Sequence, residues 1–361
     1  MLKENKKNLL LTLPVVGFSF CSNAYAIDVP ESFEYRLYGQ INQILMFADD
    51  GEKSEQFISD NSNSASRLGV IGKVDTPEGF EIGARLEAGY AQNPSNMVTM
   101  EARTIDAEFK ARQINLHIGG DFGKLTLGRT DGANNGNAES DLSGTTLALL
   151  QSPVGIGARL QFQDDGMYGP PVALVLNHQD FESRYDLIRY DTPEIGGAVI
   201  SASTGIKDDN DVYEIGSKIK HKFEGGSRLS AGLGYSAEMK DGVADKEETY
   251  GGSVSWLSSN GFNVSLTATR KVDDDESNPD ADYRSVKIGY KKGRHAVAAI
   301  YGQGSDQGKE GDDATYAGVG YLYGAAKWLQ LYGAYTVQSL DRDGRDYDDI
   351  NIAYAGVRIG F

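Results

Sequence analysis

The sequence predicts an all-β protein, an antiparallel transmembrane β-barrel of about sixteen strands whose third loop folds into the lumen. Three observations support this prediction. Segments of about ten residues alternate apolar and polar side chains along most of the chain. Short turns and longer polar loops alternate between these segments. One interval, residues 131–183, breaks the pattern and is rich in Gly, Asn and Ser, with a Pro170-Pro171 pair.

Residues 1–26 have the features of a secretory signal peptide and are excluded from the fold. Lysines near the start precede an apolar run at residues 9–20, and an Ala-x-Ala cleavage motif ends at Ala26. The run is too short for a spanning helix. A lipid anchor on the single cysteine, Cys21, is a rival interpretation, but a bulky phenylalanine precedes it. The predicted barrel domain, residues 27–361, therefore has no disulfides.

The charge balance narrows the class of partner. The chain has 52 acidic and 35 basic side chains and a formal net charge of −17; without the leader, which holds three lysines and one glutamate, the charge becomes −19. Such an acidic surface argues against nucleic acid as a partner. The 44 glycines and 20 tyrosines fit the tight turns and aromatic girdles of an outer-membrane barrel.

Each predicted strand has one apolar and one polar face. In the first strand, Leu37, Ile41 and Leu45 alternate with polar residues such as Gln40, and residues 80–92 show the clearest alternation. The predicted strands are residues 36–47, 66–76, 80–92, 109–119, 124–130, 184–191, 197–206, 212–223, 227–238, 247–258, 262–272, 282–291, 295–303, 314–323, 328–340 and 347–361.

The connections between these strands alternate in length. Short turns lie near Pro77 and Asp121, whereas the connections near Asp50 and Asn96 are longer and polar. Long loops on one side and short turns on the other are typical of outer-membrane barrels. A barrel of about sixteen strands is wide enough to hold water, and its closure satisfies every backbone polar group within lipid.

The irregular interval at residues 131–183 is too long for an ordinary connection. A structureless insert of this length is usually functional or disordered. We expect it to fold into the lumen as a constriction loop that controls what passes. Residues 155–162 within it alternate like a short strand, which indicates structure inside the loop.

Several segments resemble the Gram-negative general porins. The most specific is Gly-Asp-Phe-Gly-Lys-Leu-Thr-Leu-Gly-Arg at residues 120–129. The others are residues 66–69, 111–113, 189–193 with 196–197, and 356–361. The resemblance covers essentially all of residues 27–361 in order.

This resemblance implies a homotrimer of sixteen-stranded barrels in the outer membrane. Each barrel would be a water-filled channel for passive diffusion of ions and small hydrophilic solutes, without enzymatic activity, cofactor or metal. Outer-membrane lipid and lipopolysaccharide would surround it. The terminal Phe361 resembles the family's assembly signal, which the barrel-insertion machinery recognises. Arg129 shares a face with Leu125 and Leu127, so it points outward, and by resemblance it belongs to the trimer contact.

Basic residues are expected on the inner wall of the pore. Alternation directs Arg36, Arg67 and Arg85 away from the apolar face and into the lumen. The resemblance adds Arg112 and Arg184 and supports Arg67. Such cations opposite carboxylates on the inward loop create a transverse field, which orients dipolar solutes and rejects apolar ones.

Arg112 poses a conflict between alternation and resemblance. Strict alternation places it on the apolar face with Ile114 and Leu116, which would direct it away from the lumen. A β-bulge would restore the inward position, and so would burial of the other face in a trimer contact. Both alternatives remain open from the sequence.

The acidic partners are predicted less directly. We favour Asp164 and Asp165, which are adjacent and far from both loop anchors, although a solvated hairpin tip is the alternative for this pair. Glu139, Asp141 and Asp180 are further candidates. Low-dielectric walls strengthen charges at the narrowest section, where Asp164 and Asp165 would balance the wall arginines. The acidic loop mouths would then make the pore weakly cation-preferring.

Two other classes of function compete with a channel. The first is an outer-membrane enzyme of lipase or protease type, for which His178, Asp180 and Ser183 form the sole local cluster. The second is an adhesin or structural barrel with a plugged lumen. The acidic run at residues 273–276 lacks the glycine and the distal glutamate of a calcium loop, so it predicts no specific metal site.

Overall fold

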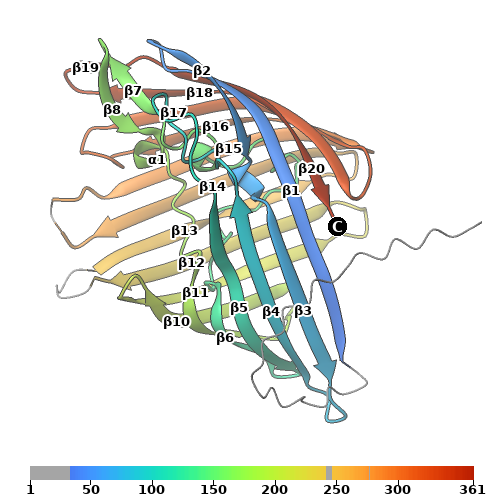
Figure 1. Cartoon of the computed structure of the whole chain (residues 1–361). Coiled ribbons are helices and arrows are strands. Elements are labelled where there is room, and N and C mark those ends of the chain that lie inside the picture. The colour runs from blue at the N-terminus through green and yellow to red at the C-terminus, as the bar shows by residue number, and fades with distance from the viewer. Residues whose placement is uncertain (1–32, 241–245, 276) are drawn as a thin grey trace, which may run out of the picture. The chain divides into compact units, whose positions relative to one another are not determined.

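The computed structural model describes residues 33–240, 246–275 and 277–361, so the predicted signal peptide lies outside the described residues. The chain divides into Met1–Glu31 and the unit Ser32–Phe361. The second unit is an antiparallel β-barrel, which confirms the predicted fold class (Figure 1). In these described residues, no helix is long and apolar enough to cross a membrane.

The main sheet contains 18 strands, and β1 closes the ring by pairing with β20 on one side and with β2 and β3 on the other. The strands β2 and β3 are one wall strand interrupted at residues 61–66, and β19 is a short extension beside β18, which leaves sixteen barrel strands. The strands of this sheet are β1 Glu34–Asp49, β2 Ser54–Asp60, β3 Arg67–Asp75, β4 Glu81–Ala91, β5 Glu108–Gly120, β6 Gly123–Asp131, β9 Arg184–Asp191, β10 Ala198–Lys207, β11 Asn210–Lys222, β12 Arg228–Met239, β13 Lys246–Leu257, β14 Phe262–Asp273, β15 Ala281–Lys292, β16 His295–Ser305, β17 Asp313–Gly324, β18 Leu329–Arg342, β19 Arg345–Asp346 and β20 Ile350–Gly360.

The wall segment β2 was not predicted. The sequence indicated a long polar loop near Asp50, but β1 and β2 form a tight hairpin there, and β2 extends the second wall strand. The segment is polar except for Phe57 and Ile58, of which Phe57 is buried and Ile58 is exposed. Two adjacent apolar residues show no alternation, so the pattern could not reveal the strand.

The outer face of the barrel is apolar. Large side chains such as Ile41 and Leu45 on β1, Leu127 on β6 and Leu233 on β12 are exposed at alternate positions, while their neighbours are more buried. An exposed apolar face of this extent is stable only against lipid or another subunit.

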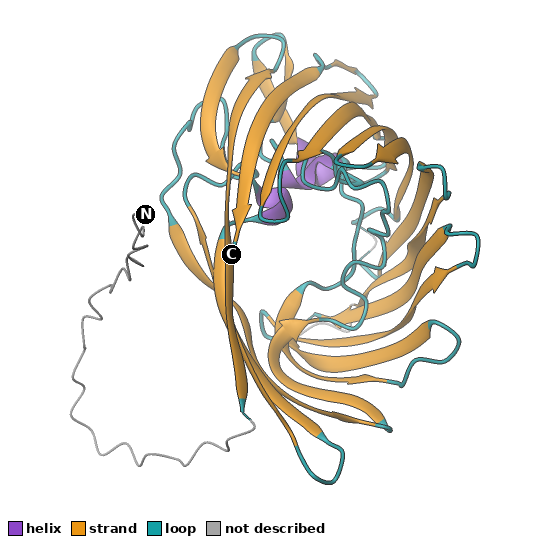
Figure 2. Cartoon of the chain, turned by 90° about the vertical axis from the view of Figure 1, so that its right-hand side faces the viewer, coloured by secondary structure: helices purple, strands orange, loops and turns teal. Residues whose placement is uncertain are grey.

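Residues 132–183 form a loop, called the inner loop below, that lies within the ring of strands (Figure 2). It contains a turn of 3₁₀-helix at Pro153–Gly155, a hairpin of β7 (Gln161–Asp164) and β8 (Met167–Pro171), and the short helix α1 (Val172–Val175). The predicted strand at residues 155–162 is therefore only partly right, since its first residues form a turn and β7 begins at Gln161.

The inner loop packs on one side of the barrel through apolar contacts. Leu149 lies over Gly318 and Gly320 of β17, where the absence of side chains makes room for it. The hydroxyl of Tyr354 on β20 donates to the carbonyl oxygen of Ala148. The buried cluster in this region comprises Ile44, Met46, Ala48, Phe57, Val98, Met100, Leu147, Ala148, Leu149, Ile156, Leu160, Phe162, Val172, Val175, Leu176, Tyr283, Ile300, Ala314, Tyr316, Leu322, Tyr332, Leu340, Ile350, Ile352 and Tyr354.

Candidate functional site: a charged inner wall

The register of the first wall strands places Tyr38, Gly69, Glu87 and Gln113 in one row across β1, β3, β4 and β5. The Tyr38 ring lies over Gly69, 2.5 Å from the position that a Cβ atom would take. A residue with a side chain at position 69 would therefore displace the ring. This glycine allows the Tyr38 hydroxyl on β1 to reach across β3 to Glu87 on β4.

Glu87 is the centre of a cluster of cations. Its Oε2 accepts hydrogen bonds from the Tyr38 hydroxyl at 2.7 Å and from a guanidinium nitrogen of Arg85 at 2.8 Å. Its Oε1 accepts from Nε of Arg112 at 2.6 Å, and Arg67 lies 4.0 Å from the same oxygen. The side chain of Glu87 is only 1 % exposed, so it is a carboxylate enclosed by three arginines.

A β-bulge explains how Arg112 joins this cluster. Glu87 pairs with Gln113, whereas the next residue, Ala88, pairs with Ala111, so Arg112 is the extra residue in β5. The bulge lets two consecutive side chains, Arg112 and Gln113, both face the lumen. The structure therefore contains the bulge that one of the two alternatives for Arg112 required.

Further cations extend the wall toward the inner loop. Arg184 forms an ion pair with Asp131 at 3.3 Å, and Gln113 donates to the other oxygen of Asp131 at 3.1 Å. Arg189 pairs with Asp191 at 2.7 Å and donates to the carbonyl oxygen of Gly132 at 2.8 Å. These wall residues hold the start of the inner loop.

The structure brings together Arg67, Arg85 and Arg112, with Arg184 beside them. Arg36 lies apart from this cluster, opposite Ile71 near the start of β1, and is exposed.

The placement of Asp164 and Asp165 opposite the wall arginines is wrong. Both residues lie at the turn of the β7–β8 hairpin, and Asp164 pairs with Arg345 of β19 at 3.0 Å. The hairpin rests on the opposite end of β1 from Phe361, because Gln163 donates to Asp50 at 3.1 Å, just beyond the end of β1. The alternative of a hairpin tip is therefore the correct one.

Other loop acids do lie inside the barrel. Asp141 is 2 % exposed and pairs at 2.7 Å with Lys287 of β15, whose side chain is fully buried. Glu139 is 37 % exposed, and its Oε1 lies 2.8 Å from Nε2 of His178. Asp180 accepts hydrogen bonds from the backbone N–H groups of Gly136 at 2.6 Å and Ala138 at 2.9 Å.

The protonation of this loop cluster follows from its surroundings. Burial raises the pKa of the Asp180 carboxyl, and the charge of Glu139 raises it further, to about 7. Burial lowers the pKa of the His178 imidazole, but the hydrogen bond and charge of Glu139 outweigh this effect and raise it. Burial would likewise raise the pKa of Glu139, yet its hydrogen bond with His178 lowers it on balance. The two groups therefore favour each other's charged forms.

The contacts of His178 do not fit a nucleophilic triad. Its Nδ1 lies 2.8 Å from Oγ of Ser152, and its Nε2 faces Glu139, so Ser152, His178 and Glu139 form a chain of hydrogen bonds. Ser152 is 1 % exposed, whereas Glu139 reaches the lumen. An active serine needs access to substrate, and here the serine is buried and the acid is exposed. Ser183, the serine expected in an enzymatic cluster, is exposed and bonds to Gly132 only through its carbonyl oxygen.

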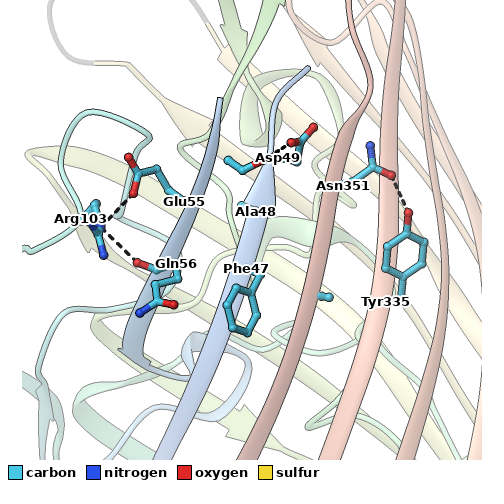
Figure 3. A pocket seen from close by; sticks show the side chains of 10 residues that line it. Phe47, Ala48, Asp49, Glu55, Gln56, Arg103, Tyr335 and Asn351 are labelled. Carbon is cyan, nitrogen blue, oxygen red and sulfur yellow. Dashed lines mark hydrogen bonds and ion pairs between the residues drawn. The ribbon is translucent and has the colours of Figure 1, made fainter. Parts of the chain in front are cut away.

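A separate pocket lies where the β1–β2 hairpin meets β18 and β20 (Figure 3). Arg103 bridges to Glu55 at 3.1 Å, and Tyr335 donates to Asn351 at 2.6 Å. Phe47 and Tyr335 are exposed, which places this pocket on the outer face. It does not belong to the charged inner wall.

The sequence did not reveal Glu87 and Tyr38 as site residues. Both lie on the polar faces that alternation assigns to the lumen, and Glu87 is two residues from Arg85 on the same face. A carboxylate on the same inward face as predicted cations is a signal that could have identified the cluster. Lys218 donates to the carbonyl oxygen of Asn135 at 2.6 Å. It lies on the polar face of its strand, so alternation alone could have identified it as an inward-facing residue.

Comparison with known proteins places these features in context. Residues 12–343 match the family model described as Gram-negative porin. No curated protein sequence matches the chain. Several solved structures share the fold with low identity. An anion-selective porin from Comamonas acidovorans is 16 % identical, with 91 % of this chain and 100 % of that chain covered and a TM-score of 0.67. OmpT of Vibrio cholerae is 17 % identical over 92 % and 99 % of the two chains, with a TM-score of 0.61. A mutant porin of Rhodopseudomonas blastica is 16 % identical over 91 % and 100 %, with a TM-score of 0.56.

Proposed function

Since the chain belongs to the Gram-negative porin family and forms an outer-membrane channel, we propose that ions and small hydrophilic solutes diffuse passively through its lumen past the charged inner wall. The observation that carries this proposal is the enclosure of Glu87 by Arg67, Arg85 and Arg112 on the inward faces of β3, β4 and β5. Fixed charges on a water-filled wall orient dipolar solutes and disfavour apolar ones.

Single-channel recording tests the channel itself. Purified protein added to a planar bilayer should produce stepwise increases in conductance, and sugars of increasing size should enter liposomes at decreasing rates. Protein that inserts without conductance steps would contradict the proposal. Hydrolysis of lipid or peptide substrates by the purified protein would instead support the enzyme class.

The ion preference is a finer question. The sequence favoured weak cation preference on the assumption that Asp164 and Asp165 balance the wall arginines. Because those aspartates lie at the mouth, we propose that the wall itself favours anions. The wall cations near the Glu87 cluster and the start of the inner loop are Arg67, Arg85, Arg112, Arg184, Arg189 and Lys218, and they outnumber the carboxylates there, which are Glu81, Glu87, Asp131, Asp191 and Glu214.

Low-dielectric walls strengthen these charges relative to those on outer loops. The acidic loop mouths oppose the wall, most strongly at low salt. The similar porin from Comamonas acidovorans is named anion-selective, but the proposal rests on the charges of this chain. Reversal potentials in a salt gradient decide it: a potential of the sign that marks cation preference, at both low and high salt, would overturn it.

The barrel is also proposed to assemble as a homotrimer. One of the similar solved structures is a trimer form, of OmpT from Vibrio cholerae. Arg129 fits the predicted contact, because it follows the exposed Leu125 and Leu127 on the same face of β6 and its Nε donates to the carbonyl oxygen of Ala111 on β5 at 3.2 Å. Replacement of Arg129 by Ala should lower the melting temperature of the trimer in detergent. An unchanged melting temperature would remove Arg129 from the contact.

Phe361 is proposed to act as the assembly signal. Its backbone pairs with Gly39 at 2.9 and 3.0 Å, and its ring lies 2.6 Å from the position that a Cβ of Gly39 would take. The terminal residue thus completes the seam between β20 and β1. Deletion of Phe361 should leave the chain in the periplasm, where fractionation would detect it; normal outer-membrane levels would contradict the role.

A further inference from the structure

The two arms of the inner loop meet inside the barrel. The outgoing arm, residues 132–141, and the returning arm, residues 177–183, are joined by a hydrogen bond from Gly132 N to Ser183 O at 2.7 Å. Farther along, the carboxylate of Asp180 accepts two backbone N–H groups of the outgoing arm. The wall supports both arms, because Thr267 donates to Ala138 O at 3.0 Å and Thr269 donates to His178 O at 2.9 Å.

At this junction, Glu139 from one arm and His178 and Asp180 from the other converge. One ligand atom from each of the three side chains lies within 4.8 Å of the other two. Residues 139 and 178 are far apart in sequence, so no motif predicted this cluster. It differs from the acidic run at residues 273–276, because it contains an imidazole and because two separate segments build it.

Neighbouring groups orient the three side chains. Ser152 lies 2.8 Å from Nδ1 of His178, which directs Nε2 toward Glu139. The two backbone N–H groups fix the carboxylate of Asp180 in the same way. A histidine that ligates a metal through one nitrogen commonly donates its other N–H to an oxygen, and ligating carboxylates are themselves hydrogen-bonded.

We propose that Glu139, His178 and Asp180 bind a divalent transition-metal ion such as Zn²⁺ within the lumen. Imidazole nitrogen with carboxylate oxygen suits this class, whereas Ca²⁺ requires six to eight oxygen ligands. Three protein ligands leave a coordination position for water. Glu139 is 37 % exposed, so the lumen supplies both the water and a route for the ion.

The His178–Glu139 pair needs only a small rearrangement to bind the ion, and the Asp180 carboxylate lies within 4.8 Å of both ligand atoms. Two ligand atoms at about 2.0–2.1 Å from a tetrahedral Zn²⁺ are about 3.3 Å apart. Nε2 of His178 and Oε1 of Glu139 are 2.8 Å apart, so they must separate by about half an ångström. The ion takes the place of the proton between them, and that proton is released to water.

Binding would join the two arms of the loop and add positive charge to the pore. Lys218 of β11 is a charged neighbour of this cluster, and Tyr283 of β15 packs edge-on against the His178 ring at 6.4 Å. Because a bound dication raises the positive potential of the lumen, Zn²⁺ should move the reversal potential toward anion preference. This effect is separate from the binding itself, which is measured without a membrane.

Calorimetric titration of the purified, untagged, folded protein with ZnCl₂ in detergent tests the proposal. We expect saturable binding of one ion per chain, weakened about tenfold or more by Glu139→Gln or His178→Gln, and also by Ser152→Ala, which removes the partner of Nδ1. The matched control is His117→Gln. His117 also faces a carboxylate, that of Glu81 at 3.2 Å, but no third ligand joins this pair among the described residues. His117→Gln should leave binding unchanged.

Two results would overturn the proposal. One is the absence of saturable Zn²⁺ binding in the wild-type protein. The other is an equal loss of binding in His117→Gln and His178→Gln. The Glu139→Gln variant preserves the shape of a partly exposed side chain, so it remains informative where His178→Gln fails to fold. Because the titration needs no conductance, its outcome is independent of the proposed ion preference.

Discussion

The inner wall of this barrel has two regions of opposite character. Around β3, β4 and β5 the inward side chains are charged, and Glu87 with its three arginines forms a network of ion pairs. Across β15 to β18 and β20 the inward side chains are largely apolar, and the inner loop covers them. The charged region stays available for solutes, whereas the apolar region anchors the loop.

This difference shows how the pattern of the strands indicates where the inner loop docks. A strand with an apolar face toward lipid and a polar face toward water has a simple period of two. On β20, Ile352 and Tyr354 are buried inside the barrel while Ala353 and Val357 are exposed outside, so both faces are apolar. A strand that is apolar on both faces within an otherwise alternating barrel indicates where a loop docks.

The largest effect on stability is expected from breaking the buried ion pair between Asp141 of the inner loop and Lys287 of the apolar region. Lys287→Met leaves the carboxylate of Asp141 buried without its partner, and loss of one member of a buried pair costs about 3–5 kcal/mol. Urea unfolding of the protein in detergent should show this loss. The double variant Lys287→Met with Asp141→Leu should recover most of it, because no buried charge remains. If the double variant is as unstable as Lys287→Met, the unpaired buried charge of Asp141 is not the cause of the lost stability.

The second largest effect is expected from a substitution in the charged region. Glu87→Gln removes the carboxylate that holds three arginines, and loss of charged hydrogen bonds in a buried site costs about 1–3 kcal/mol. It should also shift the reversal potential toward anions, unlike Lys287→Met. Glu81→Gln is the matched control for stability: Glu81 pairs with Lys73 and His117 but is 41 % exposed, so its loss should cost much less stability. Equal effects of the two substitutions would remove any special role of the Glu87 cluster.

The fold was predictable because lipid and lumen impose a regular alternation on every wall strand. Arg67 and Arg85 could be directed inward by the same rule, whereas alternation directs Arg112 outward, and its inward position depends on a bulge that one sequence cannot establish. The positions of the loop acids were not predictable in this way. They depend on contacts between distant residues, such as Lys287 with Asp141 and Tyr354 with Ala148, and local sequence gives no information on these contacts.

A smaller effect is expected from Arg67→Ser. This change removes one cation from the wall, and Arg67 lies 4.0 Å from the Glu87 carboxylate, so its loss leaves two arginines close to that group. The permeability ratio should move toward cations by about fivefold, which corresponds to an interaction of roughly 1 kcal/mol at the wall. Reversal potentials in a KCl gradient measure it. A shift toward anions would contradict the assignment of Arg67 to the pore.

The smallest effect is expected from the paired substitution Asp164→Asn with Asp165→Asn. Asp164 follows Gln163, whose side chain bonds to Asp50, and Asp50 is twelve residues beyond Tyr38 along the first wall strand. At about 3.3 Å per residue this spacing is about 40 Å along the strand from the contact of Tyr38 with Glu87. The Debye length at physiological salt is about 8 Å, so these charges are screened from the wall. The reversal potential at physiological salt should therefore stay within error of wild type, with a small shift toward anions at low salt. A shift at physiological salt as large as that of Glu87→Gln would mean that the β7–β8 hairpin reaches the charged wall when ions pass, and the contrast between the two regions would no longer hold.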